Sequence, residues 1–167
     1  MSEPGFPQVL NTMIQIVSDT TPNFASHKRF VHLRDQAGLP SLHVITGEGD
    51  RVFEIRMVTP PVYDDASGWN FYRWRVGLEL RIRYSVSNGF NHIQLLIGSD
   101  TPLLTHALMD RREWPIDQAI DAVTHVDSPG IDEVYDDSPE AKDEAVALIL
   151  VLPFEVIFRD PIIPILD

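Results

Sequence analysis

The residues with the strongest potential for chemistry form an acidic group in the second half of the chain: Asp132, Glu133, Asp136 and Asp137. Carboxylate oxygens gathered in a loop are the ligands that calcium and magnesium prefer. The segment lacks the alternating ligands, central glycine and distal glutamate of an EF-hand loop, so the pattern favours a solvated acidic loop over a metal site. The same carboxylates could supply an acid and a base for hydrolysis, but no apolar pocket is indicated that would raise one pKa.

Other catalytic signatures are missing. The sequence has no phosphate-binding glycine loop, no nucleophile elbow and no H-E-x-x-H zinc motif. Its six histidines are scattered, without a pair at the spacing of two ligands on one helix face. The absence of cysteine removes disulfides, zinc-thiolate sites and thiol nucleophiles. We therefore predict no catalytic residues, no metal and no cofactor, and we expect that the chain is not an enzyme.

A second charged set lies on one face of a predicted strand. From Tyr72 to Val86 apolar residues occupy every second position, and the positions between them hold Arg73, Arg75, Arg81 and Arg83. Because side chains alternate across a strand, the pattern predicts one apolar face and one cationic face. Such a row could hold phosphate. Glu54, Glu79 and Glu155 lie on similarly patterned stretches, however, and favour pairing with carboxylates in the same sheet or in a neighbouring subunit.

This predicted strand is too long for its own domain. Its fifteen residues, at about 3.3 Å each, would reach roughly 50 Å, whereas a compact chain of 167 residues has a diameter of about 40 Å. The strand must bend, with Gly77 as the expected site of a bulge, or project and contact another subunit. The alternative is an ordinary half-solvated antiparallel strand.

Net charge limits the possible partners. A formal charge of −12 repels nucleic-acid phosphates on average, which argues against a protein that reads DNA sequence. The charge is uneven, since Asp127 to Glu144 holds eight carboxylates and one lysine. A chain with an acidic edge and a basic face can complement a copy of itself. The longest apolar run, Ala145 to Phe154, is too short to cross a bilayer, so we expect a soluble protein without a membrane partner.

The remaining patterns predict two helices and several strands. Helices are expected over residues 7–18 and from Ser99 or Asp100 to Asp110. Strands are expected at 29–33, 42–45, 52–58, 122–126 and 145–158, with Pro153 at a bulge or a change of edge. Residues 59–69 should form a long loop, and long loops carry contacts. Four of its residues therefore join the arginines as predicted interface residues: Tyr63, Asp64, Asp65 and Trp69.

Together these elements predict an α+β fold. We expect a mostly antiparallel twisted sheet with a long β-hairpin, backed by two or three helices. One domain should cover residues 1–160, followed by an apolar tail over residues 161–167 that proline interrupts.

Several segments resemble the tail terminator proteins of long-tailed bacteriophages. The resemblance rests on the amphipathic first helix, the stretch RWRVGLELRIRYSV, the helix DTPLLTHALMD, the acidic loop and the last strand VALILVLPFEVIFRD. It implies a subunit that assembles in the host cytoplasm as a hexameric ring in the neck of the virion. Such a ring caps the tail tube, ends its polymerisation and presents a surface to the head-side connector, while DNA passes through its channel.

A negative channel would let DNA pass without adhering, because like charges repel within a Debye length of about 8 Å. We therefore predict that Asp132, Glu133, Asp136 and Asp137 face the channel. We also predict that Arg81→Glu weakens oligomerisation. The alternatives are a connector or stopper protein between head and tail, a metal-dependent hydrolase that uses the acidic loop, and an acidic cytoplasmic binding module.

Overall fold

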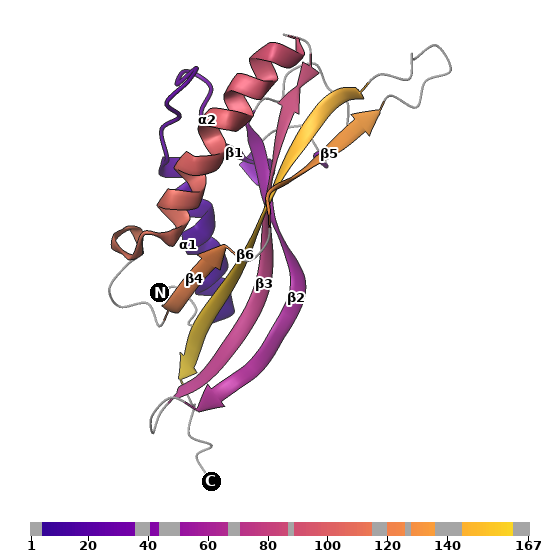
Figure 1. Ribbon diagram of the computed structural model, residues 1–167. Helices are drawn as coiled ribbons and strands as arrows, with labels where there is room; N and C mark the ends of the chain where they lie inside the picture. Colours follow the sequence, from indigo (N-terminus) through magenta and orange to yellow (C-terminus); the bar gives the residue numbers. More distant parts are fainter. Residues whose placement is uncertain are drawn as a thin grey trace.

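The computed structural model describes residues 5–35, 41–43, 51–66, 71–86, 89–114, 120–125, 128–135 and 145–161. Within them, two α-helices combine with a six-stranded sheet (Figure 1). The helices are α1 (Phe6–Asp19) and α2 (Phe90–Met109), with short 3-10 turns η1 (Leu33–Asp35) and η3 (Arg111–Glu113). The strands are β1 (Val31–His32), β2 (Val52–Ala66), β3 (Phe71–Ser85), β4 (Ile120–His125), β5 (Gly130–Tyr135) and β6 (Ala145–Pro161). This mixed content and the mostly antiparallel sheet confirm the α+β class.

The sheet has the strand order β1-β2-β3-β6-β4, and β5 also pairs with β6. Only the short pairing of β1 with β2 is parallel. β4 and β5 follow one another along the same edge of β6, β4 beside residues 154–158 and β5 beside residues 145–151. We expected Pro153 at a bulge or a change of edge. It lies in the gap between the pairings of β6 with β4 and with β5, so its missing N–H interrupts neither pairing.

Three strands are unusually long: β2 and β3 have 15 residues each, and β6 has 17. β3 pairs with β6 without a break, whereas β2 pairs with β3 through three register irregularities. The first irregularity lies opposite Gly77, where an added Cβ would be 3.0 Å from the side chain of Thr59. The bend predicted at Gly77 of β3 is therefore a bulge in β2. Glycine suits position 77, because a larger side chain there would crowd Thr59.

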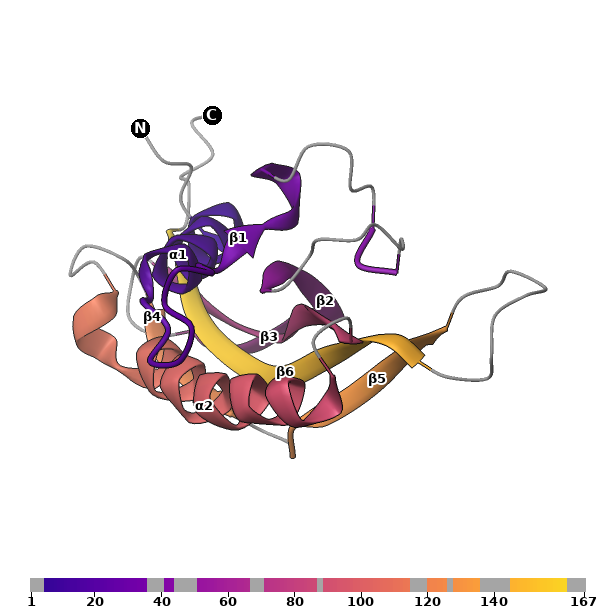
Figure 2. The ribbon, with the colours of Figure 1, turned by 90° about the horizontal axis from the view of Figure 1, so that it is seen from above.

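The long strands curve together and continue past α1 and β4 at the bottom of Figure 1. The sheet is strongly twisted, because the left-to-right order β6, β3, β2 in the lower half of that view is reversed in the upper half. Seen from above, α2 runs alongside β6, and β5 continues outwards past the end of α2 (Figure 2).

Two apolar clusters hold these elements together. The larger one joins both helices to the apolar face of the sheet. In β3 the alternating residues behave as predicted, since all of Val76, Leu78, Leu80, Ile82 and Tyr84 are buried. The smaller cluster lies on the opposite face and contains Leu42, Val52, Val134, Ala147 and Ile149. One half of the arginine-bearing face is therefore covered.

The prediction that the second helix starts at Ser99 or Asp100 is wrong, because α2 begins at Phe90 and carries Pro102 in its interior. A proline inside a helix lacks the N–H that would bond four residues back. The buried residues of α2 form one stripe along the helix, in which Asp100 separates Ile93 and Leu96 from Leu104 and Leu108. Burial of that stripe outweighs the cost of the proline. The predicted end near Asp110 is confirmed.

Proline also misled the prediction of a loop over residues 59–69. Residues 59–66 continue β2, and Pro60 and Pro61 sit at a register irregularity between Thr59 and Val62. No described strand pairs with the outer edge of β2 at these prolines. A missing proline N–H on that edge therefore removes no hydrogen bond between the described strands. Residues 67–70 lie outside the described part of the chain.

Most of the other predicted elements are present, with changes. The expected helix at 7–18 is α1, and the strands expected at 52–58, 122–126 and 145–158 are the first half of β2, β4 and β6. The strand expected at 29–33 is reduced to Val31–His32, and Leu42 and His43 form a turn instead of a strand. Part of the predicted acidic loop is strand β5. Of the predicted tail, only Pro161 is described, as the last residue of β6.

Candidate assembly surface

The four predicted interface arginines share one face of β3 but differ in exposure. Arg83 is 1% exposed and the side chain of Arg81 is 11% exposed. The side chain of Arg75 is 48% exposed, and Arg73 is half-buried. The two arginines near the end of β3 are thus enclosed by the protein, while Arg75 in particular reaches the surface.

Arg81 lies among three carboxylates of its own chain. Its Nη2 donates to Oδ2 of Asp132 at 2.8 Å, its Nη1 is 3.5 Å from Oε2 of Glu79, and its Nε is 3.9 Å from Oε1 of Glu54. The structure therefore brings together an arginine that we expected at a subunit interface and an aspartate that we expected in a channel. Part of the charge complementarity predicted between subunits is satisfied inside one subunit.

The described part of the acidic segment is an exposed edge strand. Asp132 and Glu133 are both exposed, and the hydroxyl of Tyr135 donates to the carboxylate of Glu133. Adjacent residues of a strand point to opposite faces, so these two carboxylates do not share one surface of the sheet. Asp136 and Asp137 lie outside the described residues.

The surface near the start of β3 is open and partly aromatic. Tyr63 of β2 is half-exposed and meets Trp74 of β3 edge to face, with ring centroids 5.7 Å apart. Nε of Arg75 is 3.6 Å from Oε1 of Glu155, a pair too exposed to contribute more than about 1 kcal/mol. The side chains of Asp64 and Asp65, and the whole of Trp69, lie outside the described part of the chain.

The outer edge of β2 is the most apolar exposed element of the described chain. Its exposed large residues are Met57, Val58, Val62 and Tyr63. β1 pairs only with Val52 and Phe53, so among the described strands β3 is the sole partner of the rest of β2. An exposed apolar edge presents backbone groups that another strand can bind. Sequence analysis missed this edge because the two prolines suggested a loop.

A buried ion pair that sequence analysis did not single out lies between α2 and the sheet. Arg51 and Asp100 are both fully buried. Nε of Arg51 donates to Oδ2 of Asp100 at 2.7 Å, Nη2 donates to Oδ1 at 2.9 Å, and the hydroxyl of Tyr84 donates to Oδ2 at 2.8 Å. Asp100, which the sequence suggested as the start of the second helix, lies inside α2, and its carboxylate binds a guanidinium in the interior.

The same arginine also holds the segment that leads into β1. Its Nη1 donates to the carbonyl oxygens of Ala25 and Lys28, and its Nη2 donates to that of Phe24. The guanidinium lies 5.5 Å from the centre of the Phe30 ring. Because the charge is paired and hydrogen-bonded on all sides, this arrangement has the character of a structural clamp.

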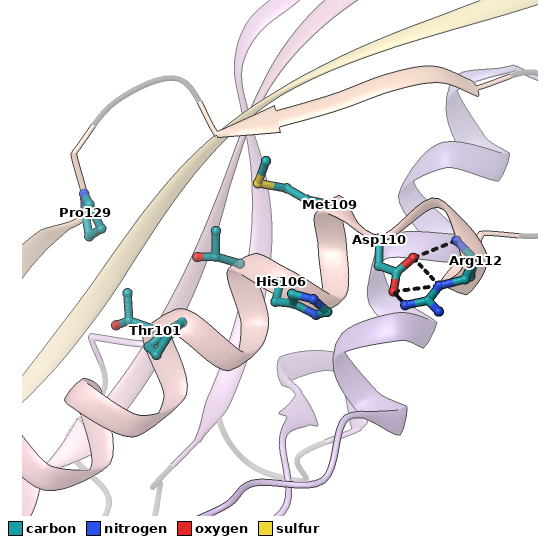
Figure 3. Close-up of a pocket in the computed structure, with 8 residues that line it drawn as sticks. Thr101, His106, Met109, Asp110, Arg112 and Pro129 are labelled. Carbon is teal, nitrogen blue, oxygen red and sulfur yellow. Dashed lines mark hydrogen bonds and ion pairs between the residues drawn. The ribbon is translucent and has the colours of Figure 1, made fainter.

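A shallow open groove of about 690 Å³ lies beside the second half of α2 (Figure 3). Its lining residues are Thr101, Pro102, Thr105, His106, Met109, Asp110, Arg112 and Pro129. Arg112 binds Asp110 at 2.7 Å and lowers the pKa of that carboxyl to about 2. A carboxylate held in this ionised form is poorly suited to proton transfer near neutral pH. Asp110 is therefore a poor candidate for an acid or base in this groove.

No group of three or more potential metal ligands occurs among the described residues. Neither described α-helix is long and apolar enough to span a membrane. The sequence matches no protein-family model and no curated protein.

Proposed function

We propose that the chain is a structural virion protein whose copies form a ring that caps the phage tail tube. The ring ends polymerisation of the tube and joins it to the head-side connector. The observation that carries this proposal is the arm, which we define as residues 57–66 of β2, 71–77 of β3 and 155–161 of β6. The outer ends of these three strands extend past α1 and β4 (Figure 1), and the β2 part of the arm exposes large apolar side chains.

The arm supports self-assembly because its β2 part exposes Met57, Val58, Val62 and Tyr63, whereas its inward side chains, such as Val156 and Phe158, are buried in the core. Both helices pack on the part of the sheet that lies away from the tip of the arm (Figure 1). Large exposed apolar patches mark protein interaction sites, and a ring needs a contact between two different surfaces of the same chain. A long β-hairpin backed by helices at one end and left open at the other is the arrangement that such a contact requires.

The predicted interface changes in one respect. Arg73, Arg75, Tyr63, Asp64, Asp65 and Trp69 belong to the arm or to the connection at its tip and remain predicted interface residues. Arg81 and Arg83 are enclosed by their own chain, so we now assign them to the stability of the subunit. Asp132 is bound to Arg81 and lies on the opposite face of β5 from Glu133, so Glu133, Asp136 and Asp137 remain the predicted channel residues.

The overall charge supports a passage for DNA. With a net charge of −12, the inner wall of a ring would repel phosphates and leave DNA free to slide. The expected partners are other copies of the chain, the tail tube protein and the head-side connector. Assembly would take place in the host cytoplasm and the product would reside in the virion neck.

The test combines mass measurement with imaging. Light scattering of the purified chain should give a discrete particle of six copies. Electron microscopy should show one such particle on each tail-tube end, and capped tubes should stop growing when tube protein is added, while uncapped tubes continue. A compact monomer at high concentration would overturn the proposal. A ring that binds isolated portal complexes and ignores tube ends would instead indicate a connector or stopper.

A further inference from the structure

The outer edge of β2 is open along most of its length. β1 pairs only with Val52 and Phe53, so over residues 54–66 no strand in the described part of the chain pairs with that edge. The exposed apolar residues Met57, Val58 and Val62 lie on this stretch. Unpaired backbone groups beside exposed apolar side chains are a template for the strand of another chain. Copies of the protein could therefore add to this edge one after another.

The composition of β2 before its prolines favours such addition. Residues 52–59 read VFEIRMVT, and the charges of Glu54 and Arg56 cancel in an ion pair of 2.7 Å. Segments with high β propensity, low net charge and no proline are those that stack into fibrils. Pro60 and Pro61 follow this segment directly and interrupt the pattern.

The two prolines take backbone donors out of β2. In regular antiparallel pairing, successive residues of a strand turn their backbone groups alternately to the neighbours on its two sides. An adjacent pair of prolines therefore removes a donor from each edge, whichever register the strand takes. On the β3 side the pairing shifts register between Thr59 and Val62. On the open side, an added strand would lack a hydrogen bond at the same point.

The irregular register of β2 acts in the same direction. β2 pairs with β3 through three irregularities between Met57 and Asp65, whereas β3 pairs with β6 through none. Bulges bend a strand and increase its twist, which makes its edge a poorer template. β3 has partners on both sides and contains no proline. Prolines and bulges thus occur together on the long strand whose outer edge is open.

We propose that Pro60 and Pro61 block strand addition at the open edge of β2. This inference goes beyond the proposed ring and does not depend on it, because it concerns the assemblies that the chain avoids. A contact between two different surfaces that does not close can continue as an open filament. An exposed apolar strand therefore needs a feature that keeps assemblies finite.

Replacement of both prolines tests the block. The double variant Pro60→Val with Pro61→Val restores both N–H groups with a residue that favours strands. Both positions are exposed, so the fold should be kept and can be checked by circular dichroism. Thioflavin T fluorescence and light scattering, followed over time, should show β-rich aggregates that grow about tenfold faster than for the wild type, or more. The matched control is Pro102→Val, the same substitution at an exposed proline of α2, and it should behave like the wild type.

A second substitution shows whether growth uses this edge. Val58 is 58% exposed, and Val58→Lys in the double variant adds a charge to the same edge, which should suppress the growth. The inference is overturned if the double variant keeps the wild-type fluorescence and mass, or if Val58→Lys leaves its growth unchanged. Should the double variant lose its fold, Pro60→Val and Pro61→Val made singly give the same test with a smaller change. Wild-type behaviour of both single variants would then overturn the inference.

The wild type and the double variant separate this inference from the proposed function. A monomeric wild type whose double variant grows into fibrils overturns the ring and supports the block. A wild type that forms a ring, and whose double variant forms the same ring and nothing larger, supports the ring and overturns the block.

Discussion

Arg75 and Arg81 lie six positions apart on the same face of β3, yet their surroundings are opposite. Arg81 is 11% exposed and lies within 4 Å of three carboxylates, from β2, β3 and β5. Arg75 is 48% exposed, and its ion pair with Glu155 is a long one of 3.6 Å. The alternation of the strand decides which face a side chain takes. Whether that face is then closed depends on what packs beside the strand.

The closed half of the sheet also holds the clamp of Arg51, Asp100 and Tyr84, whereas the open half holds the arm. Charged groups in the closed half have defined partners and should contribute to folding. The large apolar side chains that β2 exposes in the open half are solvated in the single chain and should contribute chiefly to association. Substitutions matched across the two halves can test this distinction.

The largest effect is expected at the clamp. Asp100→Ala leaves the buried guanidinium of Arg51 without its carboxylate, which should lower the free energy of unfolding by about 3 to 5 kcal/mol. Urea unfolding followed by circular dichroism measures the change. The double variant Arg51→Met with Asp100→Leu removes both charges and should be less destabilised than the single variant. An unfolding midpoint for Asp100→Ala equal to that of the wild type would show that the clamp has no role in stability.

A smaller effect is expected at Arg81. Arg81→Glu places a fourth carboxylate beside Asp132, Glu79 and Glu54, and should lower the free energy of unfolding by about 1 to 3 kcal/mol. Any loss of oligomers in this variant would then follow from a weakened fold, so stability must be measured together with sedimentation. Arg75→Glu is the matched control and should change stability by less than about 1 kcal/mol. Equal destabilisation by the two variants would remove the distinction between the halves.

The arm should respond in the opposite sense. Tyr63→Ala removes an edge-to-face contact with Trp74, so stability should fall by only about 0.5 to 1 kcal/mol. Association, measured by sedimentation velocity over a concentration series, should weaken more clearly. Leu95→Ala removes an equally exposed apolar side chain from α2 and should leave association unchanged. If both variants associate normally, the arm lies outside the interface.

The smallest effect concerns pH. Partial burial lowers the pKa of His32 below 6.5, with a further contribution from Arg34. The unfolded chain therefore binds more protons than the folded one, and stability should decline as the pH falls below about 6.5. His32→Gln should flatten this part of the profile of unfolding free energy against pH. A profile unchanged by His32→Gln would assign the pH dependence to other groups.

Sequence periodicity predicted the elements whose apolar pattern is long and regular. α1, β3 and β6 appear within a few residues of their predicted bounds, because burial of one face rewards the same spacing that the pattern displays. The errors fall where a local signal opposed a tertiary contact. Pro60 and Pro61 suggested a loop in β2, Pro102 suggested a helix start in α2, and acidic residues suggested a loop in β5.

By itself the sequence determined which side chains of β3 face the core, because the alternation of a strand is a property of neighbouring residues. The tertiary structure alone decided which of its arginines are enclosed. Arg81 meets Asp132 across 51 positions, and Arg51 meets Asp100 across 49. No local pattern encodes such distant pairings, because they form only when separate strands and helices come together around a common core.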